Sequence, residues 1–232
     1  GGIDMEAVAR LEPDLIEAMY SGLTLAQYRS LSRFAPVIGP PPGTGEFEAG
    51  WDQMIRTFGE IMGREADAEK IVTGLEHSFE ATRQAHPDWQ GASAVVAIPD
   101  GPLILTAEDA RLQFLERLGF VPHAPAEALS LGGFFYRLDK EITEPLDADL
   151  LLWLDFGGGL EPVRRNPLIA KLPSVVEERD VVADPALSAA LSYASALSLP
   201  YALARLPPLL DAALEGTAAG APAEAAPTGR AP

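Results

Sequence analysis

The spacing of hydrophobic residues changes several times along the chain, and each spacing predicts a different element. At the start, short helical patterns alternate with short apolar runs, which predicts an α-β-α-β order. Asp4 and Thr24 are typical helix N-caps, and Pro13 ends the first helix. The expected elements are a helix over residues 5–11, a buried strand over 14–19, a helix over 24–35 and an extended segment over 36–38.

Apolar residues at spacings of three and four then predict two longer helices. The first covers residues 51–62 and ends at Gly63, and the second covers residues 64–86. At 1.5 Å per residue the second helix would be roughly 35 Å long, which is about the width of a small domain. We therefore expect this helix to join two lobes.

Beyond Pro87 the pattern returns to short strands and helices. Strands that alternate with helices on each side of one long helix predict an α/β fold with two parallel-sheet lobes. The elements expected here are strands over residues 93–98, 103–106, 149–154 and 180–183, and helices over 108–118 and 200–214.

The predicted organisation has four parts. Residues 1–63 form a partial N-terminal lobe, residues 64–86 the linker helix, and residues 87–215 the C-terminal lobe. The first lobe is expected to be incomplete because the chain starts at a helix with no strand before it. Residues 216–232 are rich in Ala, Pro and Gly without apolar periodicity, so we expect a disordered tail.

One spacing occurs in both predicted lobes. Glu6 stands eight residues before Asp14, and Glu141 stands eight residues before Asp149. In the second copy Asp139 is the expected N-cap of a helix whose first turn contains Glu141. A carboxylate in the first turn of a helix is stabilised by the helix dipole, so each glutamate can be explained locally. The repeat predicts the same arrangement, a helix followed by a strand, in both lobes.

Composition excludes several classes of function. The net charge of −17 argues against nucleic-acid binding, because a phosphate backbone requires a basic protein face. The chain has no cysteine, which excludes disulfides and thiolate metal sites. Its three histidines show no metal-ligand spacing, so we expect no bare metal site. No apolar run approaches the ~18 residues of a membrane-spanning helix.

Several ordered motifs are similar to patterns of one known family. The segment "DMEAVARLEPDLI" is similar to "nlEaiaaLkPDlI", and "YRSLSRFAPVI" to "y..Lski.APvv". The stretch from Trp51 through "FGEIMGREADAEKIV", then "LDADLLLW" and "NPLIAKLPSVVEERDVV", follow the same family in order. The chain thus resembles the class III periplasmic binding proteins, and among them the iron–siderophore binding components of ABC importers.

This resemblance implies a function that the residues alone do not specify. It implies an extracytoplasmic monomer without cofactor that binds a ferric siderophore between its lobes and delivers it to a permease dimer. Members begin with a signal segment, usually a lipid-bearing cysteine, and two βα units, so we expect this sequence to be a fragment of a lipid-anchored protein. The resemblance also implies that Glu6 and Glu141, one in each lobe, pair with arginines of the permease.

Candidate ligand contacts are expected near the carboxyl ends of strands, where open α/β sheets bind ligands. Three aromatics followed by a cation, at residues 134–137, suit a flat, chelated, anionic ligand, although the same cluster could fill the C-terminal core. Trp51 could instead hold its helix in place, and Arg164 could lie in a solvated loop. The candidates are Tyr20, Trp51, Phe134, Phe135, Tyr136, Arg137, Phe156 and Arg164.

Two alternatives remain open from the sequence. Haem or a cobalamin could occupy the same aromatic walls. A different class of protein, an α/β enzyme, could use Asp100, Asp155 or Glu161 as an acid or base. The enzyme predicts turnover, whereas a binding protein predicts stoichiometric binding.

Overall fold

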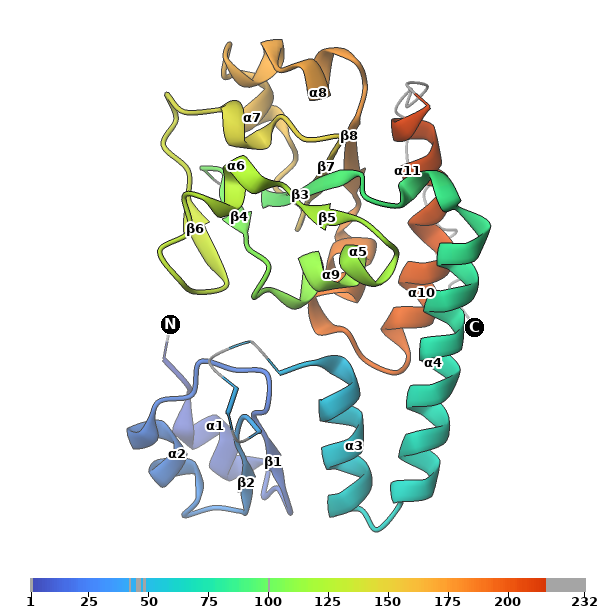
Figure 1. The fold of residues 1–232 in the computed structure, drawn as a ribbon. Coiled ribbons are helices and arrows are strands. Elements are labelled where there is room, and N and C mark those ends of the chain that lie inside the picture. The colour runs from blue at the N-terminus through green and yellow to red at the C-terminus, as the bar shows by residue number, and fades with distance from the viewer. Residues whose placement is uncertain (1, 42, 45–46, 48, 100, 216–232) are drawn as a thin grey trace, which may run out of the picture.

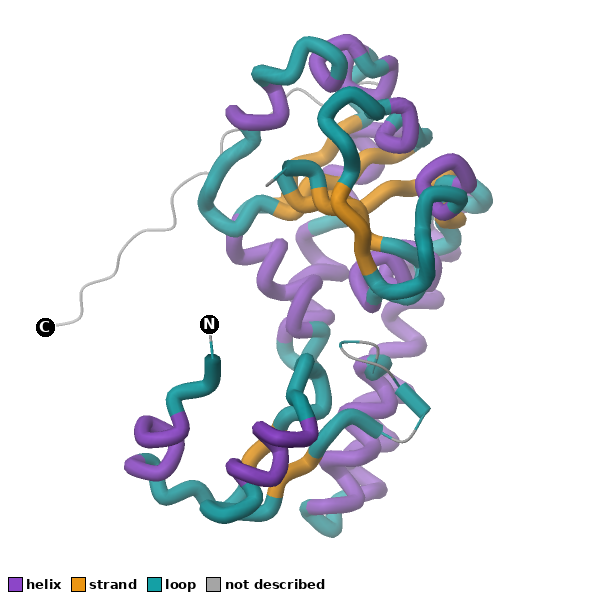
Figure 2. The backbone as a smooth tube through the Cα atoms, turned by 90° about the vertical axis from the view of Figure 1, so that its left-hand side faces the viewer, coloured by secondary structure: helices purple, strands orange, loops and turns teal. Residues whose placement is uncertain are grey.

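The chain forms two lobes joined by one long helix (Figure 1). The computed structural model describes residues 2–41, 43–44, 47, 49–99 and 101–215, so the predicted tail at 216–232 lies outside the described residues. Helix α4 (Glu65–Ala85) runs beside both lobes, and Figure 2 shows the strands gathered in two separate places, one in each lobe. The predicted α/β architecture with a linking helix is confirmed.

The N-terminal lobe follows the predicted α-β-α-β order. Asp4 accepts a 2.9 Å hydrogen bond from the Ala7 amide, and Thr24 forms a capping box with Gln27. The two strands pair in parallel, with Ile16 opposite Val37, and are shorter than the predicted run. The elements are α1 (Met5–Arg10), β1 (Ile16–Glu17), α2 (Leu25–Leu31) and β2 (Val37–Ile38).

Helix α3 (Trp51–Ile61) and helix α4 pack closely against each other. Gly59 of α3 allows the close approach, because a Cβ at this position would lie 2.4 Å from the Cβ of Ala68. On α4 Val72 is fully buried, whereas the neighbouring Ile71 is exposed. The C-terminal half of α4 packs against the C-terminal lobe, where Phe79 contacts the Phe114 ring at 5.0 Å between centroids.

The C-terminal lobe is built on a six-stranded sheet with the order β6-β4-β3-β7-β8, and β5 pairs with β3. Strands β3, β5, β7 and β8 are parallel, whereas β4 and β6 are antiparallel to their neighbours, so the sheet is mixed rather than wholly parallel. The strands are β3 (Ser93–Ile98), β4 (Leu103–Leu105), β5 (Val121–Pro122), β6 (Phe135–Arg137), β7 (Leu150–Leu154) and β8 (Asp180–Ala183).

Helices cover both faces of this sheet, and alternate residues of the central strands point into two cores (Figure 1). Leu152 belongs to the core shared with α4, whereas Leu151 and Trp153 belong to the core on the opposite face. The helices are α5 (Ala110–Arg117), α6 (Ala124–Glu127), α7 (Glu161–Arg164), α8 (Pro173–Val176), α9 (Pro185–Tyr193), α10 (Ser198–Arg205) and α11 (Pro207–Leu214), with 3-10 turns η1 (Pro87–Trp89), η2 (Glu144–Leu146) and η3 (Ile169–Lys171).

The helix predicted at Asp139, in the second copy of the repeated spacing, is wrong. Asp139 does not cap a helix; its carboxylate accepts a 3.0 Å hydrogen bond from the Glu141 amide, so the segment is a turn. Only the 3-10 turn η2 follows it before β7. Pro145 explains the difference, because proline lacks an amide donor and disfavours helical geometry in the residue before it. Glu141 is therefore exposed in a turn, whereas Glu6 lies in the first turn of α1.

No helix among the described residues combines the length and the apolar character needed to cross a lipid bilayer.

Candidate functional site

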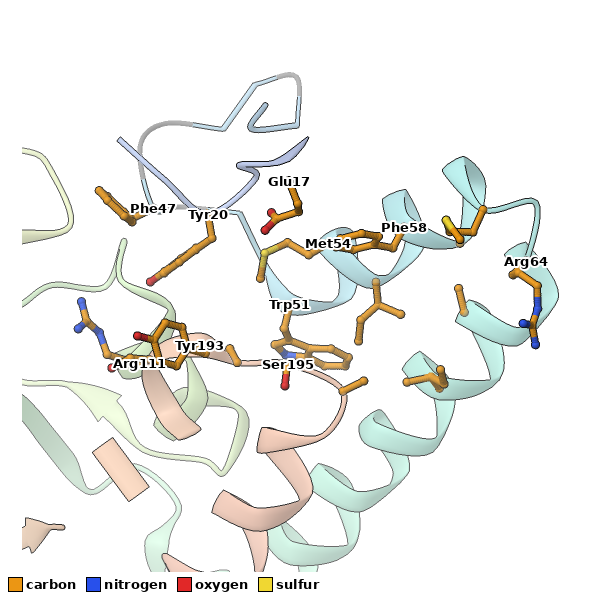
Figure 3. Close-up of a pocket in the computed structure, with 18 of the residues that line it drawn as sticks. Glu17, Tyr20, Phe47, Trp51, Met54, Phe58, Arg64, Arg111, Tyr193 and Ser195 are labelled. Carbon is orange, nitrogen blue, oxygen red and sulfur yellow. The ribbon is translucent and has the colours of Figure 1, made fainter. Parts of the chain in front are cut away.

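A cavity of about 1010 Å³ lies between the two lobes. Segments far apart in the sequence line it: the end of β1, helix α3, the start of α5, the segment before β6, the segment after β7 and the α9–α10 loop. Figure 3 shows the side chains that converge on this space. The volume is at the upper end of the ~300–1,000 Å³ range of small-molecule pockets, so the cavity can hold a large ligand.

Aromatic rings from both lobes form one wall of the cavity. The Tyr20 ring meets Phe47 edge-on, with 5.4 Å between centroids, and Phe47 is 5.4 Å from Phe134 of the C-terminal lobe. Phe134 in turn contacts Phe135 at 4.7 Å. Rings at these separations attract each other and leave their remaining faces available for an apolar or conjugated ligand.

Trp51 lies at the floor of the cavity, at the first turn of α3 (Figure 3). Its ring stacks on the Phe79 ring of α4, with 6.0 Å between centroids. The guanidinium carbon of Arg117 lies over the Trp51 ring, 5.0 Å from its centroid. The buried indole nitrogen has no hydrogen-bond partner among the described residues. Trp51 therefore holds α3 in place and also faces the cavity, so the two sequence alternatives for this residue are compatible.

Arg111, at the start of α5, is a cation that lines the cavity, and Asp109 holds it. Asp109 is 0% exposed and accepts hydrogen bonds from Arg111 Nε at 2.8 Å and Nη2 at 2.6 Å. It also caps α5 by accepting from the Arg111 amide at 2.8 Å. Burial alone lowers the pKa of Arg111, but the bonds and charge of Asp109 outweigh burial and raise that pKa above its ordinary value. The guanidinium is thus fixed and charged.

Tyr20 shares this environment. Burial is the main cause that raises the pKa of Tyr20 to about 12, and the negative charge of Asp109 adds to it, while Arg111 opposes it. In Figure 3 the Tyr20 side chain extends from the N-terminal lobe toward Arg111 and Tyr193. At neutral pH the phenol is protonated and can donate a hydrogen bond to a ligand.

Away from the aromatic wall, the cavity continues as an apolar groove between α3 and α4. Met54, Phe58 and Ile71 line this part. An ion pair between Arg64 and Asp67, with 2.6 Å between Arg64 Nη2 and the carboxylate, lies at its far end.

Half of the residues proposed from the sequence line the cavity, and half do not. Tyr20, Trp51, Phe134 and Phe156 line it. Phe135, Tyr136 and Arg137 lie on β6, and Arg164 lies at a separate cavity of about 420 Å³, where it is 3.9 Å from Asp180.

The cluster at residues 134–137 is divided because it enters a strand. Successive side chains of a strand point to opposite faces, so four consecutive residues cannot all face one ligand. Tyr136 packs against the C-terminal core and donates from its hydroxyl to the Ala126 carbonyl at 2.9 Å, as the core-filling alternative expected. Arg137 Nη1 donates to the Gly101 carbonyl at 3.3 Å.

Sequence reasoning missed Arg111, Phe47, Met54 and Tyr193 as cavity residues. Asp109 followed two residues later by Arg111 was a visible N-cap pattern. Nothing in the local sequence showed that this helix begins beside the opposite lobe.

The acids considered for an enzyme have structural contacts. Asp155 accepts from the amides of Gly157 at 2.8 Å and Gly159 at 2.9 Å, which stabilises the loop after β7. Glu161 pairs with Arg165 at 3.4 Å on the surface, and residue 100 lies outside the described part of the chain. Within the described residues, no three His, Asp or Glu side chains are grouped so that they could hold a metal ion.

Comparisons with known proteins agree with this architecture. A family model described as "Periplasmic binding protein" matches residues 1–187. A periplasmic solute binding protein from Mycobacterium smegmatis is 25% identical, with a TM-score of 0.75 over 92% of this chain and 74% of that chain. A search of curated protein sequences gave no significant match.

Two further solved structures share the fold with ligands bound. PiaA from Streptococcus pneumoniae in complex with ferrichrome is 23% identical, with a TM-score of 0.76 over 93% of this chain and 74% of that chain. FhuD2 from Staphylococcus aureus with bound ferrioxamine B is 16% identical, with a TM-score of 0.73 over 94% of this chain and 82% of that chain.

Proposed function

This chain belongs to the periplasmic binding protein family, and we propose that it binds a ferric siderophore in the cavity between its lobes. The family consists of solute-binding proteins rather than enzymes, so binding is stoichiometric. The observation that carries the proposal is the cavity of about 1010 Å³ with an aromatic wall drawn from both lobes. A compact metal chelate presents apolar edges and oxygen acceptors, which match aromatic faces, the Tyr20 hydroxyl and the Arg111 guanidinium.

The ligands in two proteins of the same fold support this proposal. PiaA holds ferrichrome and FhuD2 holds ferrioxamine B, and both ligands are ferric siderophores. Iron would reach this chain already enclosed in its chelator, so the protein needs to supply walls rather than metal ligands.

We also propose the role that follows binding. The loaded protein acts outside the cytoplasm as a monomer and delivers its ligand to the permease dimer of an ABC importer. Glu6 and Glu141 are the proposed docking residues, one in each lobe, and both are exposed. A lipid anchor on the full-length protein would hold it near the permease.

Quenching of tryptophan fluorescence tests ligand binding directly. Trp51 lines the cavity, whereas Trp89 and Trp153 do not, so a cavity ligand should quench mainly Trp51. We expect ferrichrome or ferrioxamine B to quench the signal with one-to-one stoichiometry, and a Trp51→Phe variant to lose most of the response. No binding of either chelate, by fluorescence or calorimetry, would contradict the proposal.

Phe156→Ala tests the cavity wall with a matched control. Phe156 is 51% exposed and lines the cavity, whereas Phe34 is 43% exposed and lies outside it. Removing a stacked ring should weaken siderophore binding by about 0.5–1.5 kcal/mol. Phe34→Ala should leave the dissociation constant unchanged, and equal effects of the two variants would place the ligand elsewhere.

A further inference from the structure

The charged groups that line the cavity cancel. Among the described residues, its charged lining residues are Glu17, Arg64, Asp67 and Arg111, which makes two cations and two anions and a formal sum of zero. Asp109 lies directly behind Arg111 and adds one more negative charge. The cavity therefore offers no excess of positive charge to an anionic ligand.

Arg64 and Arg111, the two cations that line the described part of the cavity, are already paired. Arg111 is held by two atoms of the buried Asp109 carboxylate, and Arg64 contacts Asp67 with 2.6 Å between nitrogen and oxygen. A cation that is paired in this way interacts more weakly with a third charge, since its partner carboxylate repels the same anion. Arg137, the cation from which the sequence suggested an anionic ligand, is not among the lining residues.

The surroundings of the cavity also disfavour anionic ligands. The chain carries a net charge of −17, so its overall field repels anions and lowers their concentration at the surface. The aromatic wall is uncharged, and the Tyr20 phenol, whose pKa is raised to about 12, is neutral at physiological pH. Neutral hydrogen-bond donors and ring faces suit a ligand with carbonyl-type oxygen acceptors.

We propose that the cavity selects ferric chelates without net negative charge, such as tris-hydroxamates, and discriminates against trianionic tris-catecholates. This inference rests on the proposed siderophore function and specifies its substrate class. The selectivity comes from Asp109, which neutralises the half-buried Arg111, together with the uncharged aromatic wall.

Titration of the wild-type chain with two chelates tests the inference. We expect ferrichrome, an uncharged ferric tris-hydroxamate, to bind at least about tenfold more tightly than a trianionic ferric tris-catecholate of similar size. Affinity for ferrichrome should also change little with ionic strength, because screening acts on charged pairs. Equal or tighter binding of the tris-catecholate would overturn the inference and leave the siderophore function intact. Failure of both chelates to bind would overturn the function and the inference with it.

A charge variant tests the cause of the selectivity. Asp109→Asn keeps an efficient N-cap for α5 but leaves the Arg111 charge uncompensated. We expect the ratio of tris-catecholate to ferrichrome affinity to rise at least about tenfold. Asp4→Asn is the matched control, since it removes one negative charge from the N-cap of α1 and should leave the ratio unchanged.

If Asp109→Asn is unstable, Glu17→Gln removes a negative charge from the exposed rim and should shift the ratio in the same direction. The proposed cause is contradicted if folded Asp109→Asn, or Glu17→Gln where it replaces that variant, has the wild-type ratio of tris-catecholate to ferrichrome affinity.

Discussion

Tyr20 shows how the pocket changes the chemistry of one side chain. An exposed phenol has a pKa near 10, whereas burial and Asp109 raise the pKa of Tyr20 to about 12 in the folded protein. Between these two values the unfolded chain has lost the proton and the folded chain retains it. The folded state then binds more protons than the unfolded state, so stability must fall as pH rises through this window.

We therefore predict that Tyr20→Phe reduces the pH dependence of stability between about pH 10 and pH 12. The wild-type free energy of unfolding should fall more steeply in this range than that of the variant, because phenylalanine has no proton to lose. Urea denaturation at a series of pH values measures both slopes, with about pH 8 as the reference where phenols are protonated in both states. Parallel slopes for the two proteins would show that Tyr20 is not shielded.

At the scale of elements, the packing of α3 against α4 fixes the floor of the cavity. Gly59 permits that packing, since its missing side chain leaves room for Ala68. Gly74 lies on α4, and a Cβ added there would have no neighbouring atom within 4 Å. Gly74→Ala therefore adds the same methyl group as Gly59→Ala, but without a clash. The two glycines separate the effect of close packing from that of helix propensity.

We predict opposite effects for the two glycine-to-alanine changes. Gly74→Ala should stabilise the protein by up to about 1 kcal/mol, because alanine is the better helix former. Gly59→Ala should destabilise it by about 1–3 kcal/mol, because the new methyl group forces α3 away from α4. Thermal or urea unfolding measures both changes. Stabilisation by Gly59→Ala would mean that the two helices can separate without cost.

For the whole molecule, the proposed transport function depends on a docking surface that lies outside the cavity. The Glu6 side chain is 92% exposed and lies 4.0 Å from Arg10, and Glu141 is exposed in a turn of the other lobe. Exposed ion pairs of this kind contribute little to stability, whereas charges at an interface rim guide docking.

Glu6→Arg combined with Glu141→Arg should abolish siderophore uptake in cells that depend on this protein. Ligand affinity and melting temperature should remain close to the wild-type values, because neither residue lines the cavity. Glu60→Arg with Glu215→Arg is the control: it makes the same charge change at other exposed positions and should leave uptake normal. Normal uptake by the first double variant would remove these glutamates from the proposed docking surface.

Local patterns predicted the strands at residues 93–98, 149–154 and 180–183 and the long helix α4, because each has a regular run of buried apolar positions. The patterns missed α9, although Asp184 followed by Pro185 is a recognisable helix start. They also predicted a helix at Asp139, where a turn forms upstream of Pro145. The segment at Asp139 is short, so long-range contacts outweigh its weak local preference for a helix.

The sequence by itself determined the two-lobed α/β organisation, the acidic surface and the family resemblance, since these depend on composition, periodicity and ordered motifs. Only the tertiary structure decided which side chains share the cavity. Tyr20, Phe134 and Phe156 meet there from distant segments, while Tyr136 of β6 packs against the core. The pairing of Arg111 with Asp109, and hence the charge that a ligand meets, follows from the same convergence. A chain pattern records which residues can be buried, but folding decides which neighbours they are buried beside.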